Sequence, residues 1–75
     1  MARQTLDAKG LLCPLPVLRA RKAIKAMAIG DVLVVEATDA GAPRDFQAFC
    51  EVTGNALLSS TDSDGVFRLE IERRT

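Results

Sequence analysis

Two closely spaced prolines mark an element boundary near the N-terminus of the chain. The stretch GLLCPLPVL, residues 10–18, places Pro14 and Pro16 directly after Cys13. Proline lacks a backbone N–H and is poorly tolerated inside strands and helices, but it is accepted in the first helical turn, where N–H groups have no intrahelical partner. We therefore predict a helix that begins here, with Cys13 as its N-cap, Pro14 at N1 and Pro16 at N3. Since Leu15 precedes a proline, the regular helix could also begin nearer Pro16.

Apolar residues follow a helical spacing from residue 14 to residue 28. The predicted helix is then stopped by Gly30-Asp31. At about 100° per residue, one apolar stripe forms, and Leu18 falls outside it among basic residues. The stripe contains Val17, Ala20, Ile24, Met27 and Ala28. A second, shorter helix is predicted from near Pro43 to Gly54, with Phe46, Phe49 and Cys50 on one face.

Four segments have the composition or alternation of strands. Residues 3–8 are a short candidate, and residues 31–38, DVLVVEAT, are rich in β-branched side chains. Residues 56–61 and 66–72 are predicted to pair as a hairpin around a turn at residues 62–65. In VFRLEIE the clean alternation of apolar and charged residues indicates one buried and one wet face.

The predicted order is therefore β-α-β-α-β-β. Two right-handed crossovers place both helices on the same side of a sheet, which gives an α+β two-layer sandwich with a four-stranded mixed sheet and two helices packed on one face. Residues 1–75 are expected to form a single domain. Val32 and Val34 are predicted to point outward from the open sheet face, a hint of self-association, and we expect a monomer or weak dimer.

Composition excludes several classes of function. The chain is 48% hydrophobic and 27% charged, which is typical of a folded soluble protein. Its longest aliphatic run, VLVV, is far too short to span a membrane, so no membrane association and a cytoplasmic location are expected. The chain has no histidine, which excludes Ser/His/Asp and Cys/His catalysis and leaves little support for a metal site. We expect no metal and no cofactor.

Charge is balanced overall but unevenly distributed. Up to Lys25 there are six basic residues and one acidic residue, and the remainder has four basic and nine acidic residues. Zero net charge argues against direct nucleic-acid binding, whereas a local basic face favours an acidic partner. The candidate docking residues on the first helix are Arg19, Arg21, Lys22 and Lys25, which could equally form an ordinary solvated helix face.

Cys13 is the candidate reactive residue. A thiol at a helix N-terminus lies in the positive end of the helix dipole, which lowers its pKa and favours the nucleophilic thiolate; Lys9 and Arg19 could add to this effect. Alternatively, Cys13 packs as a small hydrophobic side chain among neighbouring leucines. Cys50, beside Phe49 on an apolar helical face, is expected to belong to the core.

Together these segments resemble the TusA/SirA family of small sulfur-carrier proteins along nearly the whole chain. The resemblance rests on Cys13-Pro14-Leu15-Pro16, preceded by Leu6, Asp7 and Gly10, and on the segments GDVLVVEATD and RDFQAFCEVTG. It implies that Cys13 accepts sulfane sulfur as a persulfide from a cysteine desulfurase or rhodanese and relays it to an acceptor protein. The acceptor would serve tRNA thiolation, cofactor assembly or sulfur oxidation. The resemblance therefore implies a sulfurtransferase-type persulfide relay, in which this chain is not a self-contained enzyme.

Two positions bear on this resemblance. Asp45 resembles a polar position of the family, although a carboxylate in the first turn of a helix is also favourable by itself. Family members often have Gly-His-Glu-Leu after the second helix, where this chain has Gly54-Asn55-Ala56-Leu57, so a family role of that loop is in doubt.

Two other functions stay open. One is a regulatory or redox-responsive binding module whose thiol is sensed and not used for transfer. Replacement of Cys13 by Ser would separate the two, since it would abolish relay chemistry and leave pure docking intact. RNA binding ranks last, because the chain has no Trp or Tyr and its three Phe mostly fit core positions.

Overall fold

The structure is a computed structural model that describes residues 2–75. Its elements follow the predicted order, β-α-β-α-β-β. They are β1 (Arg3–Ala8), α1 (Leu15–Lys25), β2 (Val32–Ala37), α2 (Ala42–Thr53), β3 (Ala56–Ser63) and β4 (Val66–Glu72).

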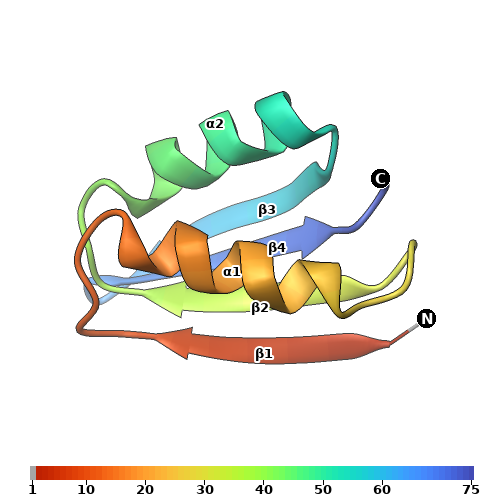
Figure 1. Ribbon diagram of the computed structural model, residues 1–75. Helices are drawn as coiled ribbons and strands as arrows, with labels where there is room; N and C mark the ends of the chain where they lie inside the picture. The colour runs from red at the N-terminus through yellow and green to blue at the C-terminus, as the bar shows by residue number, and fades with distance from the viewer. Residues whose placement is uncertain (1) are drawn as a thin grey trace.

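The elements form two layers, with both helices on one face of a four-stranded sheet (Figure 1). The strand order is β1-β2-β4-β3, in which β1 and β2 are parallel and the other two pairings are antiparallel. Because β1 and β2 are parallel, their C-terminal ends lie at the same end of the sheet, where the chain leaves each strand toward the helix that follows. The first turns of α1 and α2 therefore start close together, and the predicted two-layer sandwich is confirmed.

The core lies between the sheet and the helices. Ala20 and Ile24 of α1 and Phe46 of α2 pack there against Leu33 and Leu69, and each of these side chains is at most 4% exposed. Met27 is also buried as predicted, whereas Ala28 is exposed because α1 ends at Lys25 and the chain then turns toward β2.

The start of α1 differs from the sequence prediction by one residue. Pro14 is the N-cap and Pro16 lies at the second helical position, so Cys13 precedes the cap. The Cys13–Pro14 peptide bond is cis. The amide of Leu18 donates to the Pro14 carbonyl at 3.1 Å, which is the first α-helical hydrogen bond. Cys13 is therefore not the N-cap of α1 but the residue before it.

The hairpin turn is also tighter than predicted. Strand β3 continues to Ser63, and only Asp64 and Gly65 form the turn, both with positive φ (52° and 81°). An Asp-Gly pair suits this geometry because the two-residue hairpin turn with positive φ at both positions follows the twist of the strands. A register shift between Leu57 and Ser59 leaves Leu58 half exposed.

Arg73 and Asn55 fix the end of the chain to the helix layer. The Arg73 guanidinium donates to the carbonyls of Ile24 (3.1 Å), Lys25 (3.2 Å) and Met27, which satisfies acceptors at the end of α1. The Asn55 Oδ1 accepts hydrogen bonds from the backbone amides of Arg74 (2.8 Å) and Thr75 (3.3 Å). The loop that departs from the family pattern thus has a structural role.

The sheet face opposite the helices is covered by paired charges. Ion pairs link Arg3 to Glu70 (2.6 Å) and Lys9 to both Asp7 (3.1 Å) and Glu36 (3.2 Å), and Arg68 lies between Glu36 and Glu70. Since β2 lies between β1 and β4, the Arg3–Glu70 pair crosses over its valines. Val32 and Val34 lie on this face as predicted but are only 3% and 1% exposed, so the expected exposed apolar patch is wrong.

Candidate functional site around Cys13

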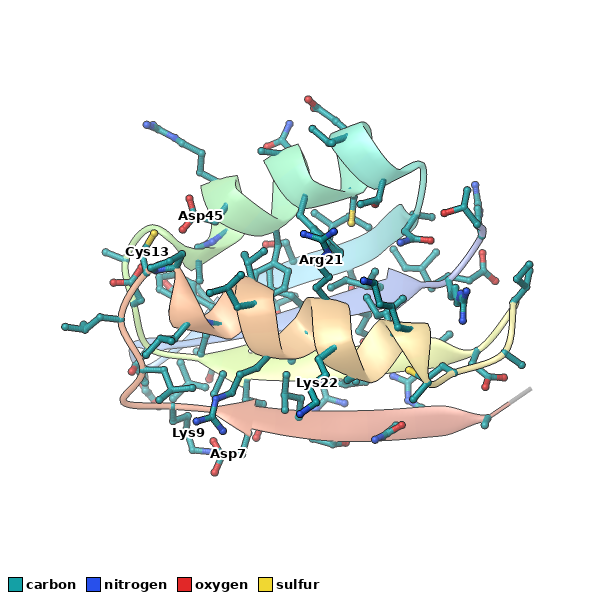
Figure 2. All side chains as sticks on the ribbon, viewed as in Figure 1. Asp7, Lys9, Cys13, Arg21, Lys22 and Asp45 are labelled. Carbon is teal, nitrogen blue, oxygen red and sulfur yellow. The ribbon has the colours of Figure 1, made fainter. Side chains whose placement is uncertain are left out.

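Cys13 lies at the edge of the sandwich, in the connection between β1 and α1, and its thiol is exposed (Figure 2). Three large apolar side chains near it in sequence are also exposed: Leu12 (69%), Leu15 (44%) and Leu18 (51%). Cys13 therefore does not pack as a small hydrophobic side chain among its leucines. The thiol is accessible, and exposed apolar side chains lie near it in the sequence. This arrangement is suited to contact with another molecule.

A groove between the two helices begins at Cys13. Helix α1 contributes Val17, Leu18 and Arg21 to its lining, and α2 contributes Asp45, Phe49 and the 87% exposed Val52, among others. The groove is mostly apolar, with charge only at Arg21 and Asp45. It forms because the two helices pack against the sheet side by side and leave the seam between them open.

Asp45 faces the thiol across the mouth of this groove (Figure 2). It stands in the first turn of α2, where a carboxylate is favoured by the helix dipole, and its amide donates to the Gly41 carbonyl at 2.9 Å. Asp45 thus combines the helix-stabilising role expected from the sequence with a position beside the Cys13 thiol. Sequence reasoning missed the second of these roles.

The pKa of the Cys13 thiol is raised, contrary to the sequence prediction. The largest cause is hydrogen bonding to the Asp45 carboxylate, followed by partial desolvation and by the negative charges of Asp45 and Asp39. A nearby carboxylate disfavours the thiolate. The cations expected to oppose this are elsewhere, since Lys9 pairs with Asp7 and Glu36 on the far side of the sheet.

The basic residues of α1 divide between two sides of the helix. Arg21 lines the Cys13 groove, whereas Arg19 and Lys22 line a separate hollow beside Leu6 of β1. Lys25 lies one turn beyond Arg21 on the α2 side. Within residues 2–75, Arg19, Arg21, Lys22 and Lys25 form no ion pair. Of these four docking candidates, only Arg21 lines the groove at the Cys13 thiol.

Cys50 is a core residue. It lies on the inner face of α2 and is 5% exposed, and burial alone raises its thiol pKa. The two thiols are both free cysteines. Cys50 is therefore in a position for packing, as predicted.

Within the part of the chain that the structure describes, no group of three or more His, Cys, Asp or Glu side chains is arranged to hold a metal ion. No helix in that part is long and apolar enough to cross a membrane.

Comparison with known proteins gives consistent results in sequence and structure. The family described as Sulfurtransferase TusA matches residues 4–73. A protein of Neisseria meningitidis serogroup A is 55% identical over 74 residues, which cover 99% of this chain and all of the relative. The sulfur carrier protein TusA of Allochromatium vinosum is 51% identical over 70 residues, covering 93% of this chain and 92% of that protein.

Among solved structures, the SirA-like protein of Desulfitobacterium hafniense has the same fold. Its TM-score to this chain is 0.85 at 30% sequence identity, and the match covers 96% of this chain and 99% of that one. The two-layer fold is thus shared with a SirA-like protein. This chain belongs to the TusA family of sulfur carriers.

Proposed function

We propose that Cys13 carries sulfane sulfur as a persulfide between a donor protein and an acceptor protein. The observation that carries this proposal is the exposed thiol at the mouth of an apolar groove. Thiol exchange chemistry requires an accessible sulfur and a surface for the partner, and it requires no metal, cofactor or histidine. Pro14 and Pro16 support the site by fixing the start of α1 beside the thiol.

Loading is an exchange without net oxidation. The Cys13 thiol first loses its proton to water. The thiolate then attacks the outer sulfur of a donor persulfide, a new S–S bond forms, the donor's S–S bond breaks, and the donor leaves as a thiolate. In unloading, an acceptor thiolate attacks the outer sulfur, and Cys13 is the leaving group. A cysteine desulfurase or a rhodanese is a donor of this chemical type.

Asp45 biases this exchange toward retention of the sulfur. A leaving thiol with a lower pKa departs faster, so the raised pKa of Cys13 slows the loss of its sulfur to small thiols. The same carboxylate holds the unloaded thiol in its less reactive protonated form. Transfer then depends on a docked partner whose contacts change the surroundings of the thiol.

Three pathways would use such a carrier: tRNA thiolation, cofactor assembly and sulfur oxidation. The partner proteins decide among them, since the carrier domain requires the same chemistry in each. We propose a protein partner on each side of the relay and no direct contact with nucleic acid. A cytoplasmic location and a monomeric or weakly dimeric state accord with this role.

A chase experiment tests the relay. The chain is loaded from radiolabelled cysteine by a cysteine desulfurase, separated from the donor and mixed with a reduced rhodanese domain as acceptor. Label should move to the acceptor from the wild type and from Cys50→Ala, and Cys13→Ser should carry none. Label that stays on the wild-type chain with every acceptor tried would favour a thiol-sensing binding module and contradict the carrier role.

A further inference from the structure

The groove at Cys13 continues beyond the thiol along the seam between the helices. A second hollow lies at the C-terminal end of α1 and shares Arg21, Phe49 and Thr53 with the first. The two hollows therefore adjoin and form one channel, which runs from Cys13 to the end of the helix pair. The reactive sulfur lies at one end of this channel.

The two ends of the channel differ in charge. The Cys13 end is apolar, and its charged group beside the thiol is the Asp45 carboxylate. The other end is lined by Arg21 and Lys25, and also by Arg73, whose guanidinium already donates to backbone carbonyls, including that of Thr75. Arg21 and Lys25 are exposed, form no ion pair within residues 2–75, and are four residues apart on a helix, so their side chains lie on the same face. An anionic group is favoured at this end and disfavoured beside the thiol.

The length of the channel sets the spacing of a complementary ligand. With a rise of about 1.5 Å per helical residue, Arg21 lies about 12 Å and Lys25 about 18 Å along the seam from Cys13. An extended peptide advances about 3.3 Å per residue, so a segment of about four or five residues reaches from Cys13 to the region between Arg21 and Lys25.

We propose that the channel binds an extended segment of the partner protein with its sulfur-bearing cysteine at Cys13 and an acidic side chain about four or five residues away. This inference rests on the proposed function. Apolar side chains between the two ends of the segment contact Leu18, Phe49 and Val52. The surface thus recognises a spacing between a cysteine and an acidic residue in its partner, as well as the cysteine itself.

The opposite side of α1 and the open sheet face do not offer the same match. Arg19 and Lys22 line a hollow that does not include Cys13, and the charges of the open face are paired with one another. Among the unpaired basic residues of α1 in the described part of the chain, Arg21 is the one that lines the same groove as the thiol. Charge reversal at Arg21 should therefore weaken recognition of the acidic side chain, whereas charge reversal at Arg19 should leave it unchanged.

Synthetic peptides with an activated cysteine test this proposal. Each peptide carries its cysteine as a mixed disulfide with thionitrobenzoate. The Cys13 thiolate attacks the peptide sulfur, the S–S bond to thionitrobenzoate breaks, and the coloured thiolate that leaves reports the rate. One pair of peptides has Glu four residues after or four residues before the cysteine, with apolar residues between. A control peptide of the same composition has Glu next to the cysteine. All proteins carry Cys50→Ala.

At about 0.15 M salt, where charges beyond about 8 Å are screened, at least one spaced peptide should react roughly five- to tenfold faster at limiting concentration than the control. Arg21→Glu should abolish this preference, and a peptide with Lys in place of the spaced Glu should restore it. Arg19→Glu should keep the wild-type preference. Equal rates for all peptides, or equal losses in Arg21→Glu and Arg19→Glu, would overturn the inference.

Loading by inorganic polysulfide separates this failure from failure of the proposed function. Polysulfide is small and requires no contact with the far end of the channel, so the protein with Arg21 intact should load from it whether or not the peptides show a spacing preference. Loading without any peptide preference would remove the extended-segment inference alone. Absence of loading in every protein would count against the carrier role itself.

Discussion

The two cysteines of this small chain have the same functional group in opposite surroundings. Cys13 is exposed in a connection at the edge of the sandwich, and Cys50 is buried on the inner face of α2. Both thiols have raised pKa values, but the causes differ, since Asp45 is the largest influence at Cys13 and burial acts at Cys50. The direction of the pKa shift alone therefore does not distinguish the exposed thiol from the buried one. The exposure of each thiol and the charges beside it make that distinction.

Chemical labelling should show the largest difference between the two thiols. In the native protein, iodoacetamide should modify Cys13 more than about a thousandfold faster than Cys50, because Cys50 reacts only in the small unfolded fraction. Peptide mapping by mass spectrometry over time measures both rates, and denaturant should bring them together. Native rates that differ by less than about tenfold would mean that Cys50 is accessible and would end its assignment to the core.

Replacement by serine should affect stability at one site only. Cys50→Ser places a hydroxyl group in an apolar setting and should reduce the free energy of unfolding by about 1–3 kcal/mol. Cys13→Ser, at an exposed position, should change it by less than about 0.5 kcal/mol. Urea denaturation of the wild type and the two variants provides the comparison. A larger loss in Cys13→Ser than in Cys50→Ser would reverse the two assigned roles.

Removal of the Asp45 carboxylate tests the effect of neighbouring charge on the Cys13 thiol. Asp45→Asn should lower the Cys13 pKa, because the residue supplies the largest influence that raises it. Alkylation of Cys13 near pH 7 should then become roughly two- to tenfold faster, with the pH–rate profile displaced toward acid. Glu51→Gln, on the outer surface of α2, is the matched control. A profile that moves toward alkali or stays in place would show that Asp45 does not hold the thiol.

The smallest expected effect is on the pH dependence of stability. A thiol with a raised folded-state pKa binds its proton more tightly in the folded chain. Its contribution is therefore fully present below the unfolded-state pKa of about 8.5 and is lost as the pH rises from there through the folded-state pKa. Urea midpoints between about pH 7 and pH 9.5 should fall less in Cys50→Ala than in the wild type. A steeper fall in the variant would contradict the direction of the shift.

Much of the fold follows from local patterns in the sequence. The prolines after Cys13, the β-branched run in β2 and the alternation in β4 each identify their element, and Gly54 ends α2 with a positive φ of 84°. Boundaries were less accurate where side-chain and backbone geometry decide them. The turn at Asp64-Gly65 and the one-residue displacement of Cys13 from the N-cap are two examples.

The site was predicted less completely than the fold. Cys13 itself follows from its motif, but the influence of Asp45 depends on two segments that are far apart in the sequence. The predicted topology does contain a signal for their meeting, since parallel β1 and β2 send both helices from the same sheet edge. The burial of Val34 could not be inferred, because it requires an ion pair between Arg3 and Glu70 across an intervening strand.

Intact-protein mass spectrometry shows whether Cys13 is the residue that carries the sulfur atom. The wild type, Cys13→Ser and Cys50→Ala are each incubated with a cysteine desulfurase and cysteine, and with inorganic polysulfide. The wild type and Cys50→Ala should gain the mass of one sulfur atom that reductant removes, and Cys13→Ser should gain none. An adduct that persists in Cys13→Ser, or no adduct in the wild type with either donor, would contradict the account.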